Sequence, residues 1–158
     1  MGKSALKVYL SKSKIPKAGR GVFAVTGIKQ GEIIERCPII ETPVKDYSHL
    51  RKTELKSYYF LWNRVKAKGD QNLWSKKSKV KIKDKKAAIA LGYGSLYNHS
   101  YQPNATYKKK FKEKVIDFIA ICPIKKGEEI TVNYNLGDPT NTSSLWIKSI
   151  KPPRGFPE

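Results

Sequence analysis

The chain of 158 residues is long enough for one domain with a buried core, and too short for a catalytic domain together with a separate recognition domain. Its 32 Lys and Arg against 13 Asp and Glu give a formal net charge of +19, and its hydrophobic content of 39% excludes the core-poor composition of disordered chains. Because lysine supplies most of the positive charge, we expect sequence-independent contact with nucleic acid phosphates that weakens at high salt.

Short β-branched or aromatic runs, bounded by clusters of Gly, Pro, Asn or Lys, predict strands. In chain order they are residues 6–10, 22–25, 32–40, 87–91, 115–121 and 129–134. A single helix is predicted over 46–57, with Asp46 as a candidate N-cap. This pattern predicts a mostly β domain of short strands and turns, without the strand-helix alternation of a parallel α/β sheet.

One short sequence occurs twice. Residues 28–33 read IKQGEI and residues 124–130 read IKKGEEI, and each copy follows one apolar run and leads into another. Both copies are expected to be turns that feed a strand. Two similar β units on either side of a variable middle would form a pseudo-symmetric clip, although a match of this length also arises from common turn chemistry.

The middle and the end of the chain are less regular. Residues 64–86 form a basic insertion around Trp74, which is either a solvated loop or a phosphate-facing patch in which Trp74 packs or stacks. A second basic run, residues 108–114, is expected at a hairpin tip. The tail, residues 135–158, is rich in Pro, Gly, Ser and Thr but keeps Trp146, so we expect it to fold back onto the domain.

Several kinds of site are excluded by the residues that the chain lacks. With only two histidines, His49 and His99, no multi-histidine metal centre can form. The cysteines Cys37 and Cys122 form no CxxC pair and are expected to be reduced, partly buried thiols. No apolar signal segment or membrane span is present, so we expect a soluble intracellular protein, in the cytoplasm or associated with a nucleoid or nucleus, and no membrane partner.

Three segments carry the chemical signal. They are residues 17–24 (KAGRGVFA), 92–105 (GYGSLYNHSYQPNA) and 127–134 (GEEITVNY). In this order they closely resemble the signature of SET-domain protein lysine methyltransferases, and the similarity is greatest to minimal viral and bacterial members that lack accessory domains. The resemblance implies a SET domain over 1–134: a β-clip of several small sheets with one or two short helices and a pseudoknot-like threading of the C-terminal segment. Residues 135–158 would be a tail like the post-SET segment, without its zinc cluster.

The resemblance also implies that the chain binds S-adenosylmethionine and releases S-adenosylhomocysteine. The glycine turn would hold the methionine part of the cofactor, the Asn-His pair would meet the nucleoside, and an aromatic residue of the tail would cover the adenine or the channel. The implied cofactor-binding residues are Lys17, Ala18, Gly19, Arg20, Gly21, Asn98, His99, Tyr134 and Trp146. No metal and no covalent intermediate is required.

Tyr134, which closes the GEEITVNY motif, matches the central catalytic tyrosine of the family. Tyr107 occupies a position where some members narrow the lysine channel, and Tyr58 resembles a pocket tyrosine of the minimal viral members. Plain core packing is the alternative for Tyr107 and Tyr58. Val132 fills the place of the aromatic product switch found in other members, so Tyr107 with Val132 favours low-order methylation.

The expected substrate is an exposed lysine of another protein, such as a histone-like tail. A basic enzyme repels a basic tail, so we expect that the substrate is engaged on DNA or on nucleosomes. A non-histone target is an alternative, and so is a nucleic-acid-binding module that keeps the SET scaffold with little or no turnover. A homodimer is an alternative way to close the active site.

Overall fold

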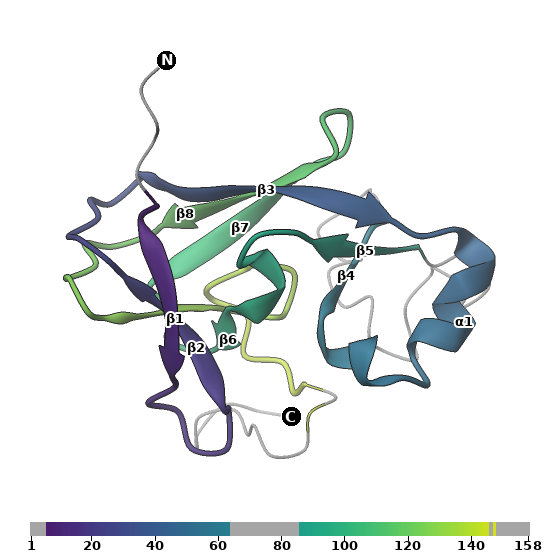
Figure 1. Ribbon diagram of the computed structural model, residues 1–158, viewed down its shortest axis with the longest axis horizontal. Helices are drawn as coiled ribbons and strands as arrows, with labels where there is room; N and C mark the ends of the chain where they lie inside the picture. Colours follow the sequence, from purple (N-terminus) through teal and green to yellow (C-terminus); the bar gives the residue numbers. More distant parts are fainter. Residues whose placement is uncertain (1–5, 64–85, 146, 148–158) are drawn as a thin grey trace.

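The computed structural model describes residues 6–63, 86–145 and 147 and shows a mostly β protein built from two small sheets (Figure 1). The strands are β1 (Val8–Lys12), β2 (Arg20–Ala24), β3 (Ile33–Glu41), β4 (Tyr59–Leu61), β5 (Ala87–Ala90), β6 (Asn98–His99), β7 (Ala105–Lys110), β8 (Val115–Ala120) and β9 (Glu129–Val132). The strand order is β1-β2-β9-β6 in one sheet and β4-β5-β3-β8-β7 in the other. Trp146 and nearly all of the basic insertion lie outside the described residues.

The six strands predicted from apolar runs are confirmed, and three others were missed. β6 has only two residues, too few for a detectable pattern. β7 reads ATYKKK, where the lysines hide the strand although alternate residues are buried. β4 reads YFL and follows directly on a turn, so that it looks like part of the preceding polar segment. β7 and β8 form the hairpin that the basic run at 108–114 predicts.

The single helix predicted over 46–57 is wrong. The segment instead forms three short pieces: a 3-10 helix (Val44–Asp46), α1 (Tyr47–Leu50) and a second 3-10 helix (Glu54–Ser57). Asp46 stands at the N-cap of α1 but its side chain makes no capping hydrogen bond. Thr53 has an extended backbone, and its hydroxyl accepts a hydrogen bond from the backbone N–H of Leu55, so it starts a new helix instead of continuing the old one. Among the described residues, no helix has the length and apolar character needed to cross a membrane.

The two copies of the repeated turn adopt the same geometry and pair with each other. The backbones of Ile28 and Ile124 exchange two hydrogen bonds, each 2.9 Å long. The central glycines, Gly31 and Gly127, both have a left-handed backbone, with φ of +82° and +75°. In each copy the lysine N–H donates to the carboxylate of the first glutamate, at 3.0 Å and 2.9 Å. The repeat therefore marks two equivalent turns that join distant parts of the chain.

The core that supports the site centres on β8. Ile116, Phe118 and Ala120 are at most 1% exposed and point to one side of this strand. The ring of Tyr97 stacks on Phe118 with 4.4 Å between ring centroids, and the Tyr97 hydroxyl donates to Glu35 at 3.0 Å. The residues just before β6 are thereby fixed against the large sheet.

The chain that follows β9 runs between β6 and β7. On one side, the backbone N–H of Tyr134 donates to Nδ1 of His99 at 3.0 Å. On the other side, the hydroxyl of Thr106 donates to the carbonyl of Gly137 at 2.5 Å. Further on, the carbonyl of Ser143 accepts a hydrogen bond from Asn135 at 2.8 Å and another from the hydroxyl of Tyr101 at 3.1 Å, so Ser143 lies against the segment after β6. The predicted threading requires this passage between two earlier segments.

Candidate active site

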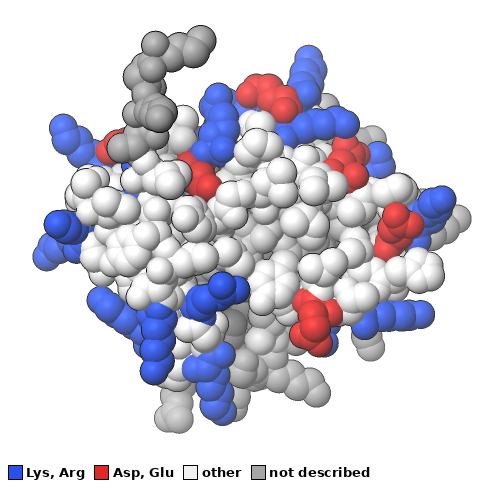
Figure 2. All heavy atoms as spheres, in the orientation of Figure 1, with Lys and Arg blue, Asp and Glu red and all other residues white. Residues whose placement is uncertain are grey.

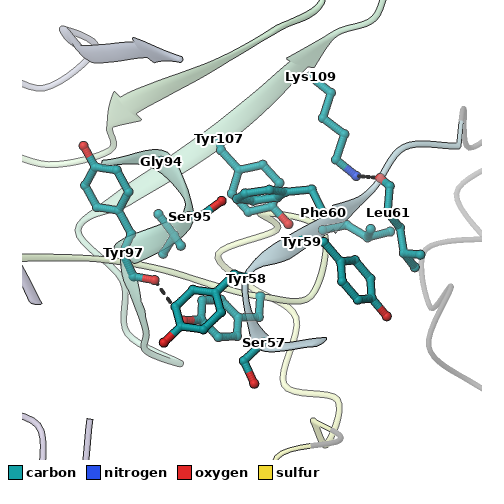
Figure 3. Close-up of a pocket in the computed structure, with 13 residues that line it drawn as sticks. Ser57, Tyr58, Tyr59, Phe60, Leu61, Gly94, Ser95, Tyr97, Tyr107 and Lys109 are labelled. Carbon is teal, nitrogen blue, oxygen red and sulfur yellow. Dashed lines mark hydrogen bonds between the residues drawn. The ribbon is translucent and has the colours of Figure 1, made fainter. Parts of the chain in front are cut away.

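A pocket in which tyrosine is the most frequent lining residue lies where β4, β7 and the segment after β9 converge (Figure 3). We name it the tyrosine pocket, and its lining residues are Ser57, Tyr58, Tyr59, Phe60, Leu61, Gly94, Ser95, Tyr97, Tyr107, Lys109, Val132, Tyr134 and Leu136. Its volume is about 40 Å³. Since a water molecule needs about 10–15 Å³ on the same measure, the pocket has room for a group of only a few heavy atoms.

Tyr134 is held by two hydrogen bonds to neighbouring residues of one segment. Its hydroxyl donates to the carbonyl oxygen of Tyr97 at 2.8 Å, and its backbone N–H donates to His99. Burial raises the pKa of the Tyr134 hydroxyl to about 12, and the nearby Tyr58 adds to this effect. The phenol is therefore protonated at neutral pH, and its hydroxyl is available as a polar group in the pocket.

The other two predicted pocket tyrosines lie at different depths. Tyr107 is 7% exposed, and its ring meets that of Phe60 edge-on at 5.1 Å between centroids. Burial raises the pKa of the Tyr107 hydroxyl above its usual range. Tyr58 is 42% exposed and lines the pocket (Figure 3). It lies close enough to Tyr134 to contribute to the raised pKa of that residue. The structure thus brings all three predicted tyrosines to one cavity.

His99 is buried and neutral. Because Nδ1 accepts the backbone hydrogen bond from Tyr134, the ring proton is on Nε2, which is buried and has no hydrogen-bond partner in the described part of the chain. Burial lowers the pKa of His99 to about 4. The imidazole also packs edge-on against Tyr101, with 4.4 Å between ring centroids. His99 thus holds the backbone of Tyr134 and presents one unused N–H donor.

The glycine turn, residues 17–21, ends the connection from β1 and includes the first two residues of β2. Lys17 and Gly19 have a left-handed backbone, with φ of +65° and +73°. A Cβ atom on Gly19 would meet nothing within 4 Å, so the turn has open space on that side. A Cβ on Gly21 would instead collide with the carboxylate of Glu129 and lie 3.2 Å from Nδ2 of Asn98. Only glycine therefore lets β2 lie this close to the other two segments.

The sequence did not single out Glu129, whose carboxylate connects the start of the β1–β2 loop to the NHS segment (residues 98–100). This carboxylate accepts hydrogen bonds from the hydroxyl of Ser13 at 2.7 Å, from the backbone N–H of Lys14 at 2.8 Å and from Nδ2 of Asn98 at 3.0 Å. Nδ2 of Asn98 also donates to the carbonyl of Arg20 at 2.9 Å. The amide of Asn98 therefore faces protein acceptors. The sequence signal that could have identified Glu129 is its place as the second glutamate of the GEEI motif, where it begins β9.

Tyr97 and Asn98 are consecutive residues that face different parts of the site. The carbonyl of Tyr97 faces the tyrosine pocket, where it accepts the hydrogen bond from Tyr134, whereas the side chain of Asn98 reaches the glycine turn. None of the five residues of that turn lines the tyrosine pocket. One short segment therefore contacts the tyrosine pocket through Tyr97 and the glycine turn through Asn98.

Two further residues of the site were missed. Glu35 braces the site, because its carboxylate accepts hydrogen bonds from the hydroxyl of Tyr97 and from the backbone N–H of Tyr93, each at 3.0 Å. Lys109 reaches into the tyrosine pocket from β7 and donates to the carbonyl of Leu61 at 2.6 Å (Figure 3). The period of two along a strand could have placed Lys109 on the face of Tyr107, had β7 been predicted.

Over residues 6–63, 86–145 and 147, no three His, Cys, Asp or Glu side chains gather in a way that could hold a metal ion. Cys37 is fully buried, and burial next to Glu35 raises the pKa of its thiol above the usual range.

Known proteins resemble this chain in sequence and in structure. The profile of the SET domain matches residues 19–135. A Schizosaccharomyces pombe histone-lysine N-methyltransferase specific for H3 lysine-37 is 29% identical over 119 residues, which cover 75% of this chain and 67% of the relative.

Two solved structures share the fold. One, a Plasmodium falciparum protein assigned as a histone methyltransferase, superposes with a TM-score of 0.51 at 29% identity, covering 81% of this chain and 96% of that one. The other belongs to Chaetomium thermophilum polycomb repressive complex 2 bound to S-adenosylmethionine, with a TM-score of 0.60, 20% identity, and coverage of 85% of this chain and 16% of that one. Since the family profile spans most of the described residues, the chain belongs to the SET domain family.

Proposed function

We propose that this chain transfers a methyl group from S-adenosylmethionine to the ε-amine of a lysine in a histone or a histone-like, DNA-associated protein. Membership of the SET domain family supports the reaction, and the name of the S. pombe relative supports the class of substrate. The observation that carries the proposal is the position of Tyr97 and Asn98, which separate a narrow tyrosine pocket from an open glycine turn.

The residues around the glycine turn fit a nucleoside cofactor with an amino-acid end. The open side of Gly19 leaves room beside backbone groups, and the buried N–H of His99 is a donor with no partner among the described residues. We assign Lys17 to Gly21, Asn98 and His99 to cofactor binding, with Tyr134 at the boundary between cofactor and substrate. The role of Trp146 in covering the adenine or the channel stays a proposal that rests on the sequence. When bound, the cofactor supplies an electrophilic methyl group on a sulfonium.

The tyrosine pocket prepares the amine. A lysine ammonium has no lone pair, and reaching the neutral form at pH 7 costs about 4 to 5 kcal/mol from a reference pKa of about 10.4. Desolvation between the rings of Tyr107 and Tyr58 disfavours the charged form. The oxygen of Tyr134, fixed by the carbonyl of Tyr97, orients the amine for an in-line displacement, and such positioning contributes about 7 kcal/mol or more in well-aligned systems.

The variant Tyr134→Phe tests the assignment. It removes the hydroxyl and keeps the ring, so we expect cofactor affinity in calorimetry to remain and radiolabelled methyl transfer to core histones to fall by about 10²-fold or more, as for loss of an orienting polar group. Tyr9→Phe, on the exposed face of β1, is the matched control and is expected to keep full activity. Full activity in Tyr134→Phe would refute the role of the hydroxyl, and absence of cofactor binding by the wild-type protein would refute the function.

The basic surface supports engagement of the substrate on DNA. The β1–β2 hairpin carries Lys12, Lys14, Lys17 and Arg20, with no acidic residue between them in sequence and no salt bridge among the described residues. Figure 2 shows Lys and Arg side chains gathered at the lower left, where Figure 1 places this hairpin. Such a patch attracts phosphates without reading bases, and a nuclear or nucleoid location follows from the proposal.

A salt series distinguishes the alternatives. We expect nucleosomal or DNA-bound histones to be methylated faster than free histones at low salt, with the advantage lost as salt increases. Equal methylation rates for DNA-bound and free histones at every salt concentration would contradict the proposed contact with DNA. DNA binding without methyl transfer would favour the binding module, and transfer only to other proteins would favour a non-histone target. Sedimentation of the same samples tests whether the protein forms a homodimer.

A further inference from the structure

Among the described residues that line the tyrosine pocket, one is charged, and it is a cation. Lys109 enters the pocket from β7, while no Asp or Glu contributes to the lining. A site built to bind an ammonium would be expected to supply a carboxylate, because an opposite charge nearby favours the charged form. The tyrosine pocket instead carries a positive charge, which has the same sign as the ammonium it would receive.

Lys109 is held in a defined position. Its Nζ donates to the carbonyl of Leu61 at 2.6 Å and lies 6.0 Å from the ring centroid of Tyr107 (Figure 3). Alternation along β7 puts Tyr107 and Lys109 on the inner face and leaves Lys108 exposed on the outer face. Burial lowers the pKa of Lys109 to about 8, so that near neutral pH the side chain carries a charge that is costly to keep.

The other titratable groups that face the pocket are phenols. They are Tyr58, Tyr59, Tyr97, Tyr107 and Tyr134. Burial raises the pKa of Tyr59, Tyr107 and Tyr134, so these phenols stay neutral and do not offset a positive charge. A second lysine that enters the pocket would share a poorly solvated space with Lys109. Two like charges in such a space titrate as a pair, and the first proton leaves at a lower pH than it would from either group alone.

We propose that Lys109, held in place by the carbonyl of Leu61, is a positive charge in the wall of the tyrosine pocket that drives the substrate amine into its neutral, nucleophilic form. The inference rests on the proposed function. The substrate ammonium releases one proton to water, and its lone pair then forms the new nitrogen–carbon bond while the bond between methyl carbon and sulfur breaks. Lys109 gains and loses no atom in this step. It acts on the protonation of the substrate and so is a positioning residue.

The test is the pH dependence of methyl transfer to core histones in Lys109→Met, with Lys108→Met as the matched control on the same strand. We expect the midpoint of the kcat profile to move up by about one pH unit in Lys109→Met, as for removal of one like charge several Å away. At pH 7 kcat then falls about tenfold, at high pH it returns to the wild-type value, and KM does not rise. Lys109→Arg keeps the charge and is expected to keep the wild-type midpoint.

Four results would overturn the inference. One is an unchanged midpoint in Lys109→Met, and another is the upward shift in Lys109→Arg as well. A third is a uniform gain in activity with a lower KM, which would mean that the side chain only obstructs the pocket. The fourth is methylation of Lys109 itself, seen by peptide mass spectrometry. If Lys109→Met does not fold, Lys109→Gln replaces it. A wild-type protein that binds cofactor but methylates no histone would defeat the proposed function, whereas an active wild type with unshifted variants defeats this inference alone.

Discussion

The protonation state of His99 should control the stability of the fold in mild acid. The ring accepts a hydrogen bond from the backbone N–H of Tyr134 through Nδ1, and burial holds its pKa at about 4. In the unfolded chain a histidine titrates near 6.5. Between these two values the unfolded state binds more protons than the folded state, so stability rises with pH in this window and is lost as pH falls through it.

The magnitude follows from the shift. A difference of about 2.5 pKa units at about 1.36 kcal/mol each gives a loss of up to about 3 kcal/mol between pH 7 and pH 4. The slope is at most about 1.4 kcal/mol per pH unit. Because small domains have about 5–15 kcal/mol of total stability, a loss of this size is easily measured. Below about pH 3, well under both pKa values, the contribution of His99 should not change further.

Urea denaturation of wild type and His99→Asn at several pH values between 4 and 7.5 provides the assay. The Asn side chain keeps an acceptor for the N–H of Tyr134 and does not titrate. Lost ring packing lowers the stability of the variant equally at every pH, while the acid-induced loss should shrink by up to about 3 kcal/mol relative to wild type. His49→Asn, at the exposed histidine, is the control and should follow the wild-type slope. Parallel curves for wild type and His99→Asn would refute the reasoning.

Three further predictions concern other parts of the site. Gly21→Ala should displace the carboxylate of Glu129, lower stability by about 1–3 kcal/mol and weaken cofactor binding in calorimetry. Gly19→Ala, strained but unobstructed, should cost about 1 kcal/mol, so equal losses in the two variants would contradict the close-approach argument. Tyr107→Phe removes a hydroxyl from the pocket wall, and mass spectra of product histones should show more highly methylated lysine. An unchanged distribution of methylation states would show that Tyr107 does not control the number of methyl groups added. Cys37 should resist iodoacetamide until the protein is unfolded, and its rapid alkylation in the native state would contradict its burial.

The sequence predicted the strands with apolar faces and the identity of the motifs, because both are local properties. The repeated IKxGE turns were also recognisable, although only the structure shows that Ile28 pairs with Ile124. β7 was missed because its inner face carries Tyr107 and Lys109 while the three consecutive lysines suggest a solvated loop. A period of two is visible only once the strand is assumed.

The parts of the site that were missed depend on contacts between distant segments. Glu129 acts through Ser13 and Asn98, and Lys109 is fixed by the carbonyl of Leu61. No rule of spacing relates these positions, since they meet only after both sheets have formed. The resemblance to a family identified Tyr134 and the NHS segment, but it gave no information on Lys109 in the pocket wall.

The antiparallel pairing of β4 with β5 also affects how the chain tolerates change in length. Leu61 lies opposite Ala87, and the N–H of Trp62 donates to the carbonyl of Lys86 at 2.8 Å, so the two ends of the basic insertion are already held together. The entropy of closing a loop between joined ends grows only slowly with its length. Additions or deletions between residues 63 and 86 should therefore leave the catalytic geometry intact, which makes this point in the chain a natural position for grafting a new recognition element.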